Sequence, residues 1–440
     1  MQRLLKQFVE KHLRYSPLFY KRLKVVQALE QADDRRIAAW REEKLLRLIH
    51  GAYRKSSFYK SRYDEHGVDI NQIKSVQDLS LCPVITRQDI VDHYPRMVVG
   101  SRLSQIKAKS SGTSGQSVTV YRDYRSVIEE GAYQWAHRIS FGHRPGMKTV
   151  VIRGNLARQE KERYDPFTKT LYLSSFCLNR ESADWYFNRI RDFAPNAIFA
   201  YPSSVESLAN FFIERGQRLR IPLIFTSSET LYSYQREKIT RAFDSRVVDW
   251  YGNAERTIAL KEGADGRYDQ LPLYSINEFR DDCIITTGLI NFRFPLIRYR
   301  VDDVVLPRPT SWQEKICQIQ GRSDDVLLLP DGTRVGLICN AFDGIRHLRQ
   351  SQVVQKDPST IRVNLVTTDA YSREDEAQLV RQLKESIGEA APFSLHYVSE
   401  DKIVRSRRGK FKLIVNELAA NSAQTTISEV SPNEDTRWHQ

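Results

Sequence analysis

The chain has 440 residues, a formal net charge of +13 and a hydrophobic content of 41%, values typical of a globular protein with room for more than one domain. No run of 18 consecutive apolar residues occurs, so the sequence predicts no membrane-spanning helix. The first residues lack an uninterrupted apolar segment, which argues against a signal peptide. Five scattered cysteines without a CxxC pair favour reduced thiols in a cytoplasmic protein and argue against a zinc site.

The positive charge is concentrated at the N-terminus. Residues 1–60 hold 15 Lys and Arg against 6 Asp and Glu, a balance of +9. Apolar residues at helical spacing, opposite basic ones, predict an amphipathic helix that contains Leu4, Leu5, Phe8 and Leu13. Such a helix can cover its own domain or make peripheral contact with an anionic membrane, and both alternatives stay open.

The first two thirds of the chain predict a helical region followed by an α/β core. Residues 1–65 have apolar residues at helical spacing, interrupted by Pro17. From about 100 to 320, short apolar strands alternate with helical stretches. We expect buried strands at 150–152 and 197–200, an alternating strand at 118–121, and helices at 205–214 and 233–243.

The last hundred residues predict a small α+β domain that begins near 325. Strands at 326–329 and 333–335 flank a Pro-Asp-Gly turn. A second helix should begin at Ser372, which forms a capping-box pattern with Asp375. The other expected elements are a helix at 336–349 and strands at 360–367 and 393–398. The final residues, 419–440, are polar and aperiodic and are expected to be disordered.

Residues 107–123, KAKSSGTSGQSVTVYRD, combine hydroxyl side chains with two glycines and then become an alternating strand. Hydroxyls and glycine backbone N–H groups can wrap an anion, because glycine permits close approach and positive φ. The run is not a Walker motif, since Gly112 and Gly115 are three residues apart and Gln116 follows. By itself it fits a phosphate-binding loop and a flexible surface linker equally well.

Four further stretches are considered together with this run because of their order and spacing along the chain. They are LCPVITRQDI at 81–90, DWYGNAE at 249–255, PLIRYRVDD at 295–303 and GRSDD at 321–325. In order and spacing they resemble the motifs of adenylate-forming enzymes, the acyl-CoA synthetase superfamily. Over roughly residues 40–418 the chain resembles the phenylacetate–CoA ligase-like branch. The resemblance implies an α/β and α+β protein, with a large N-terminal adenylate-forming domain of helices around β-sheets and a small, mobile α+β C-terminal domain.

Combined with the patterns above, the resemblance predicts four parts of the chain. They are a helical N-terminal region of the large domain at 1–65, an AMP-binding core at 66–323, a small C-terminal domain with a catalytic lysine at 324–418, and a disordered tail at 419–440.

The resemblance also assigns site residues by position, with ATP, Mg²⁺ and coenzyme A as cofactors and co-substrates. The phosphate loop is Ser110, Ser111, Gly112, Thr113, Ser114 and Gly115. The adenine and ribose contacts are Ser228, Glu229, Tyr251, Gly252, Asp303 and Arg322. Glu255, with Thr113, would hold Mg²⁺, because a hard cation bridges carboxylate and phosphate oxygens. Asp324 is the expected hinge. Asp302 stands where the family usually has glycine, which leaves open which of the two aspartates contacts the ribose.

Residues 405–412, RSRRGKFK, are by composition a basic surface patch. The resemblance implies a sharper role for one of them. Lys410 would enter the site during adenylation and stabilise negative charge on the substrate carboxylate and the α-phosphate. Arg407, Arg408 and Lys412 are expected to remain on the surface.

The acyl pocket is expected, by position, along the stretch that follows the strand at 197–200 and around the YGNAE motif. Its candidate residues are Phe199, Tyr201, Ser203, Ser204, Trp250 and Asn253. The aromatic ones fit the protein core equally well, so both readings stay open.

The implied reaction joins a carboxylic acid to AMP with release of pyrophosphate and then transfers the acyl group to coenzyme A. A capsule-associated, CapK-like group within the same branch suggests an alternative, amide formation on an amine or amino sugar for surface polysaccharide. A second alternative is a catalytically lapsed homologue that binds a polyanion or a membrane. No nucleic-acid module is predicted, because aromatic residues are not interleaved with basic ones.

Overall fold

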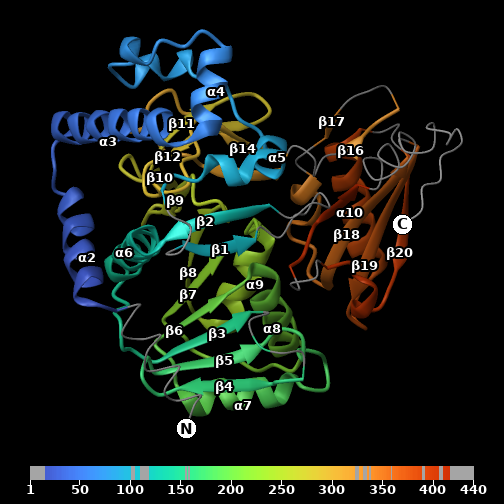
Figure 1. The fold of residues 1–440 in the computed structure, drawn as a ribbon. Coiled ribbons are helices and arrows are strands. Elements are labelled where there is room, and N and C mark those ends of the chain that lie inside the picture. Colours follow the sequence, from blue (N-terminus) through green and yellow to red (C-terminus); the bar gives the residue numbers. More distant parts are fainter. Residues whose placement is uncertain are drawn as a thin grey trace, which may run out of the picture. The chain divides into compact units, whose positions relative to one another are not determined.

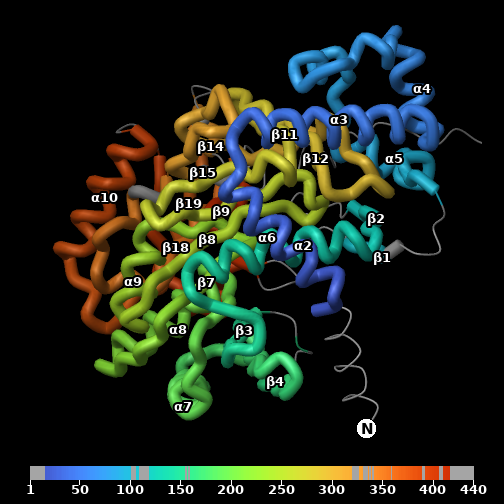
Figure 2. The backbone as a smooth tube through the Cα atoms, turned by 90° about the vertical axis from the view of Figure 1, so that its left-hand side faces the viewer, coloured from blue at the N-terminus to red at the C-terminus, as the bar shows by residue number. Residues whose placement is uncertain are grey.

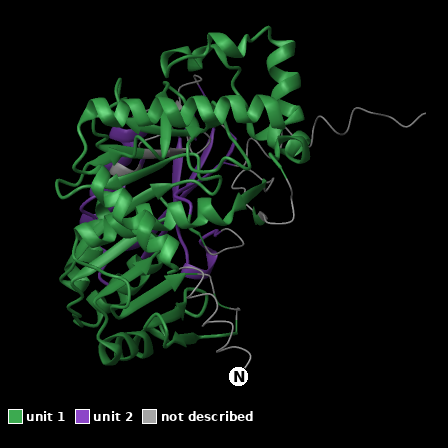
Figure 3. Ribbon diagram, turned by 60° about the vertical axis from the view of Figure 1, so that its left-hand side comes forward, with its two compact units in different colours: residues 1–323, 406–411 green, residues 324–405, 412–440 purple. Residues whose placement is uncertain are grey.

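The computed structural model describes residues 15–100, 105–109, 118–153, 156, 159–322, 327–330, 334–335, 338–357, 359–388, 392–405 and 410–416. The chain forms two compact units (Figure 3), residues 1–323 with 406–411 and residues 324–405 with 412–440. Lys410 therefore belongs to the larger unit, although the chain before and after its segment belongs to the smaller one. Several predicted features lie outside the described residues: the amphipathic helix near Leu4, the phosphate loop at 110–115, the hinge Asp324, the surface arginines Arg407 and Arg408, and the tail at 419–440.

An eight-stranded sheet forms the centre of the larger unit (Figure 1). Its strand order is β10-β9-β8-β7-β6-β3-β5-β4. The strands are β3 (Thr149–Arg153), β4 (Glu162–Asp165), β5 (Thr170–Ser174), β6 (Ala197–Ala200), β7 (Leu223–Ser227), β8 (Arg246–Gly252), β9 (Ala259–Glu262) and β10 (Tyr268–Gln270). The five adjacent strands β5, β3, β6, β7 and β8 are parallel. Antiparallel strands flank them at the two edges, β4 beside β5, and β9 with β10 beside β8. The predicted α/β core is confirmed.

Helices cover both faces of this sheet. One face packs against α7 (Ala183–Phe193), α8 (Pro202–Glu214) and α9 (Ser233–Phe243). The other face packs against α6 (Tyr124–Ser140), beside which lies α2 (Pro17–Leu29), as Figures 1 and 2 both show. Because side chains alternate along a strand, Ile198 of β6 packs among α7, α8 and α9, whereas its neighbour Phe199 packs toward α6.

The N-terminal helices build a second core beside the central sheet. The helices are α3 (Asp34–Lys55), α4 (Ser57–Glu65), η1 (Ile70–Gln72), η2 (Gln77–Leu81) and α5 (Arg87–Met97). They pack on shorter antiparallel strands, β1 (Gln105–Lys109) with β2 (Thr119–Asp123), and β11 (Ser275–Phe279) with β12 (Ile284–Gly288) and β13 (Tyr299–Val301). A further antiparallel pair, β14 (Asp303–Leu306) with β15 (Gln318–Arg322), packs instead against β9, β10 and β12. Pro17 was expected to interrupt a helix, but it opens α2 at the first helical turn after the cap residue Ser16, where its missing N–H is not needed.

The smaller unit is an α+β fold. Its sheet has the order β20-β19-β18-β21, beside a two-stranded hairpin of β16 and β17. The elements are β16 (Leu327–Leu328), β17 (Arg334–Val335), η3 (Ile338–Phe342), β18 (Leu348–Asp357), β19 (Thr360–Thr367), α10 (Arg373–Ile387), β20 (Phe393–Tyr397), η4 (Glu400–Lys402) and β21 (Ile414–Asn416). The capping box at Ser372 and Asp375 is present, and the expected strands at 360–367 and 393–398 are confirmed as β19 and β20.

The predicted helix at 336–349 is wrong. Among the described residues of that range, the only helical element is the short 3-10 helix η3, and β18 already begins at Leu348. Gly344 takes a positive φ of 74°, a backbone conformation that ends a helix. Pairing of β18 with β19 then holds the following residues extended. This long-range pairing overrides the local helical pattern.

Phe212 provides a test of the core that positions α8. Its side chain is fully buried and contacts the Phe187 and Phe243 rings, with centroids 5.1 Å and 5.4 Å away. Phe212→Ala should lower the free energy of unfolding by about 3–5 kcal/mol, because it leaves a cavity in a packed core. Urea unfolding followed by tryptophan fluorescence measures this change. The exposed control Glu237→Ala should stay within about 0.5 kcal/mol of wild type, and an equal loss in both variants would contradict the role given to Phe212.

Candidate active site

Several predicted site residues meet at one edge of the central sheet. The parallel strands β3, β6, β7 and β8 all end at this edge, at Arg153, Ala200, Ser227 and Gly252. Loops that leave the carboxyl ends of parallel strands diverge, and the crevice between them is the usual ligand site of an α/β sheet. The predicted residues Tyr201, Ser228, Glu229, Asn253 and Glu255 follow these strand ends directly.

Glu229 joins two segments that are far apart in the sequence. One carboxylate oxygen accepts a hydrogen bond from the backbone N–H of Ser203, in the first turn of α8, at 3.1 Å. The other accepts from the backbone N–H of Phe411 at 2.9 Å. A carboxylate is favoured at a helix N-terminus because the first N–H groups have no partner inside the helix. Glu229 therefore fixes the residue next to Lys410 against the start of α8.

The side chain of Lys410 reaches the same edge of the sheet. Its Nζ donates a hydrogen bond to the carbonyl oxygen of Ser228 at 3.0 Å and lies 5.7 Å from the centroid of the Tyr201 ring. Ser228 itself has a positive φ of 75°, which turns its carbonyl out of the line of β7. The predicted catalytic lysine, the adenine-side residue Ser228 and the acyl-pocket residue Tyr201 are thus neighbours.

Arg153 is a second cation at this point, and the sequence analysis did not identify it as a site residue. Its guanidinium lies 5.4 Å from the Tyr201 ring centroid, and its Nη2 donates to the Ser227 hydroxyl at 2.8 Å. Burial lowers the pKa of Arg153, against the opposing effects of Tyr201 and Glu229. Its Nε is buried without a hydrogen-bond partner among the described residues. Two cations beside one aromatic ring create a positive field that suits a carboxylate or a phosphate. The available signal was an arginine at the end of a buried strand, where ligands bind.

Tyr251 and Asp303, both predicted nucleotide contacts, form one hydrogen-bonded pair. The Tyr251 hydroxyl donates to Oδ2 of Asp303 at 2.5 Å. Asp303 opens β14 and stands opposite Arg322 of β15 in the strand register. Asp302 instead accepts a hydrogen bond from Nε of Arg300 at 3.0 Å. Of the two aspartates left open by the sequence, Asp303 is the one that the fold places beside Tyr251.

The turn after β8 holds Glu255 in a buried position, with 7% of its surface exposed. Asn253 shapes the turn, because its side-chain oxygen accepts from the backbone N–H of Thr257 at 2.9 Å and its amide donates to the Thr257 hydroxyl at 2.6 Å. The Asn253 amide is therefore used locally. Gly252 is needed for close approach, since an added Cβ would lie 3.3 Å from Nε1 of Trp250 and 3.4 Å from the carbonyl oxygen of Ile258.

Two arginines, Arg122 and Arg256, lie near Glu255, and the sequence analysis did not foresee them. Arg122 donates a hydrogen bond to the carbonyl oxygen of Ala254. Burial, reinforced by the nearby Arg256, lowers the pKa of Arg122 to about 10, while Glu255 acts in the opposite direction. No group of three or more His, Cys, Asp or Glu that could hold a metal occurs within the described ranges. One carboxylate fits Mg²⁺, which usually takes one or two protein carboxylates and completes its ligands with substrate phosphates and water.

The predicted acyl-pocket aromatics are separated by the sheet geometry. Phe199 lies between the Phe225 and Trp135 rings, with centroids 5.5 Å and 6.3 Å away. Trp250 contacts His137 at 5.5 Å on the face that α6 covers. Both contribute to the core there. Tyr201 and Ser204 are instead buried at the start of α8, where the Tyr201 ring lies beside Lys410.

A buried acidic pair supports the strand that carries Tyr251. Glu262 of β9 accepts from the backbone N–H of Asp249 at 2.5 Å and from Nη2 of Arg236 at 2.6 Å. The Asp249 side chain accepts from Thr226 at 2.5 Å and from Tyr268 at 2.8 Å. Burial raises the pKa of both carboxyls, that of Glu262 to about 7.

The chain is similar to known ligases over most of its length. Protein CapK of Staphylococcus aureus is 24% identical over 431 residues, which cover 92% of this chain and 94% of that protein. The phenylacetate-coenzyme A ligase of Thermus thermophilus is 24% identical over 68% of this chain and 74% of that protein. Residues 327–417 match the CapK C-terminal domain. These homologies confirm the predicted resemblance, and the relatives named as enzymes are ligases.

Solved structures agree on the fold. The crystal structure of 2-hydroxyisobutyryl-CoA ligase in the postadenylation state, in complex with R3-HIB-AMP, matches with a TM-score of 0.68. Its identity is 14%, and the match covers 88% of this chain and 91% of that one. The anthranilate CoA ligase AuaEII in complex with anthranoyl-AMP matches with a TM-score of 0.51 and 13% identity, over 73% of this chain and 66% of that one. Among the helices of the described residues, none is both long and apolar enough to cross a bilayer.

The raised pKa of Glu262 predicts a pH dependence of stability. The folded state retains a proton that the unfolded chain releases, so this group should make the free energy of unfolding fall as pH rises from 4.5 to about 7. Glu262→Gln keeps a neutral side chain and should remove this contribution, at most about 1.4 kcal/mol per pH unit. Urea unfolding at several pH values compares the slopes. An unchanged slope in Glu262→Gln, relative to the exposed control Glu237→Gln, would refute the assignment.

Proposed function

We propose that this chain, a homologue of CapK and of the phenylacetate–CoA ligases, is an AMP-forming ligase that activates a carboxylic acid at the carboxyl edge of its central sheet. It would join the acid to AMP, release pyrophosphate and pass the acyl group to coenzyme A or another acceptor. The observation that carries the proposal is the position of Lys410, whose ammonium reaches the ends of β6 and β7 beside Tyr201 and Ser228.

The nucleotide would be held by residues from three strand ends. Asp303 can accept hydrogen bonds from both ribose hydroxyls, because a carboxylate has two acceptor oxygens. Tyr251, which hydrogen-bonds to Asp303, would lie against the adenine together with Gly252. Ser228 would contact the edge of the adenine. Arg322, which pairs with Asp303 in the strand register, would be a further contact. The phosphates would be bound by the loop from Ser110 to Gly115.

The first half-reaction would form one bond and break another at the α-phosphorus. A carboxylate oxygen of the substrate attacks this phosphorus, and pyrophosphate leaves with the electrons of the broken P–O bond. Lys410 and Arg153 would stabilise the negative charge that the carboxylate and the α-phosphate share in the transition state. Neither cation has to move a proton for this purpose, so charge and position are sufficient. This function of Arg153 is supported by its buried Nε, which has no hydrogen-bond partner among the residues that the structure describes.

Glu255 and Thr113 would hold Mg²⁺, which when bound neutralises charge on the phosphates of ATP. Arg122 and Arg256, beside Glu255, add positive charge to the same corner. In the second half-reaction, an acceptor thiol or amine attacks the acyl carbon, loses its proton and displaces AMP. The product is a thioester or an amide.

The acceptor is either coenzyme A or an amine. The likeness to the phenylacetate–CoA ligases supports coenzyme A. The alternative, suggested by the resemblance to CapK, is an amine acceptor such as an amino sugar for surface polysaccharide. Mass spectrometry of products formed with coenzyme A, or with a panel of amino sugars, separates the two. An acyl-CoA product and no acyl-sugar would settle the choice for the thiol.

The role of Lys410 predicts a selective loss of adenylation. Lys410→Ala should reduce ATP–pyrophosphate exchange at least about 100-fold, a typical effect of removing one group that stabilises transition-state charge. The exchange is measured with Mg²⁺ and a panel of aryl, fatty, amino and sugar acids. Lys402→Ala, which removes an exposed lysine of the smaller unit, should remain as active as wild type. Exchange in Lys410→Ala near the wild-type rate would refute the assignment.

Glu229 should position Lys410 without touching the reacting atoms. Glu229→Ala removes both acceptors, for Ser203 N–H and Phe411 N–H, and should lower the maximal exchange rate about 10- to 100-fold. Because the nucleotide contacts remain, the KM for ATP should change less than twofold. Glu229→Gln keeps one acceptor oxygen and should recover part of the rate. An increase in KM for ATP at an unchanged maximal rate would instead assign Glu229 to adenine binding.

A further inference from the structure

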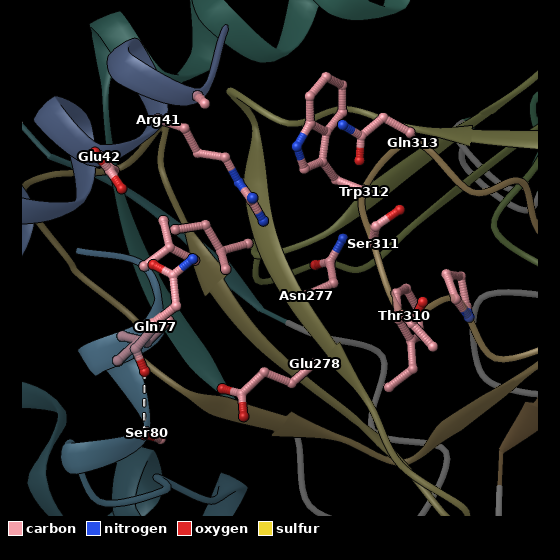
Figure 4. Close-up of a pocket in the computed structure, with 16 residues that line it drawn as sticks. Arg41, Glu42, Gln77, Ser80, Asn277, Glu278, Thr310, Ser311, Trp312 and Gln313 are labelled. Carbon is pink, nitrogen blue, oxygen red and sulfur yellow. Dashed lines mark hydrogen bonds between the residues drawn. The ribbon is translucent and has the colours of Figure 1, made fainter. Parts of the chain in front are cut away.

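A cavity of about 460 Å³ lies in the larger unit and involves none of the residues of the candidate active site. Its walls come from α3, η2, β11 and the segment between β14 and β15 (Figure 4). Its volume falls within the range of about 300–1,000 Å³ that is usual for small-molecule sites. The walls contain both charged and apolar side chains, and their chemistry indicates the kind of ligand that the cavity suits.

Arg41 supplies a positive charge without a partner. Figure 4 shows its side chain extending from α3 toward the middle of the cavity. Its Nε is buried and has no hydrogen-bond partner, and no ion pair involves its guanidinium, in the part of the chain that the structure describes. Burial lowers the pKa of Arg41 to about 10, opposed only by the charge of Glu42. A buried guanidinium is costly unless an anion meets it, and its planar fork suits a carboxylate.

Glu42 supplies a negative charge from the next position of α3. Its carboxylate attracts Arg41 through space, yet neither a hydrogen bond nor an ion pair ties it to any residue within the described ranges. The other acid in the wall, Glu278, is already neutralised. Its oxygens accept from Arg298 at 2.9 Å and 2.9 Å and from Arg280 at 3.0 Å. One cation and one anion therefore remain available to a ligand.

The rest of the wall combines polar and apolar side chains, and the polar ones are Gln77, Ser80, Asn277, Thr310, Ser311 and Gln313. Trp312 stands on the segment between β14 and β15, opposite Arg41 in Figure 4. The other apolar wall residues are Val76, Leu79, Ile276, Phe279 and Pro309. Such a surface gains free energy by covering a hydrocarbon or aromatic group.

From these features we propose that the cavity is a second ligand site for a small zwitterion with an apolar body, of the chemical class of a free amino acid. Its carboxylate pairs with Arg41, its ammonium group pairs with Glu42, and its side chain lies against Trp312. A ligand with both charges satisfies both wall residues, whereas a simple anion leaves Glu42 unpaired and a simple cation leaves Arg41 unpaired.

Three probes of nearly equal size test the proposal without ATP. L-Phenylalanine carries both charges, 3-phenylpropionate lacks the ammonium group, and 2-phenylethylamine lacks the carboxylate. Isothermal titration calorimetry should give L-phenylalanine a Kd of about 1 mM or tighter and the other two probes about tenfold weaker binding. Equal binding of all three, or no binding of L-phenylalanine up to about 10 mM, would overturn the proposal.

Single substitutions assign the charges. Arg41→Gln should weaken L-phenylalanine and 3-phenylpropionate about tenfold and leave 2-phenylethylamine unchanged, whereas Glu42→Gln should do the reverse. Arg35→Gln, an exposed arginine on the same helix outside the cavity, is the matched control. Ala38→Phe fills the exposed rim of the cavity and should abolish binding without disturbing the core. Binding that persists in both Arg41→Gln and Ala38→Phe would place the ligand elsewhere and refute the site.

Discussion

The parallel alignment of β3, β6, β7 and β8 is the constraint on which the candidate site depends. Because the four strands run in one direction, residues as far apart in the chain as Arg153 and Gly252 leave the sheet at a single edge. The helices packed on the two faces fix the position of each strand in the sheet. They therefore also fix the position of the residues that follow each strand. Glu229 then uses this edge to hold the segment with Lys410, which has no strand of its own in the sheet.

Local patterns predicted the elements whose stability is local. The capping box of α10 and the boundaries of α9 are each specified by residues within a few positions of one another. The helix expected at 336–349 failed for the opposite reason. There the decisive contacts are the pairs between β18 and β19 and the positive φ of Gly344, which a helical spacing of apolar residues does not encode.

The candidate site divides in the same way. Motif positions predicted that Ser228, Tyr251 and Asp303 belong to one site. In the fold, Ser228 follows the end of β7, and Tyr251 near the end of β8 hydrogen-bonds to Asp303. The sequence did not identify Arg153 and Arg122, because their neighbours lie on other strands and loops, 74 and 132 positions away in the chain. The aromatic pocket was ambiguous because Phe199 and Tyr201 are two positions apart, so strand alternation alone would give them the same face. Because β6 ends at Ala200, Tyr201 no longer follows the strand alternation. The Phe199 ring therefore packs toward α6, whereas the Tyr201 ring lies beside Lys410.

The two-stranded sheet of β14 and β15 links the cavity to the candidate active site within the larger unit. One end of it carries Asp303 opposite Arg322, and the segment that connects its strands carries Trp312 in the wall of the cavity. A ligand that draws this segment toward α3 would therefore act on β14 and β15. A nucleotide bound at Asp303 would act on the same two strands. Thermodynamic linkage makes this effect reciprocal. If the ligand of the cavity changes the affinity for the nucleotide by some factor, the nucleotide changes the affinity for that ligand by the same factor.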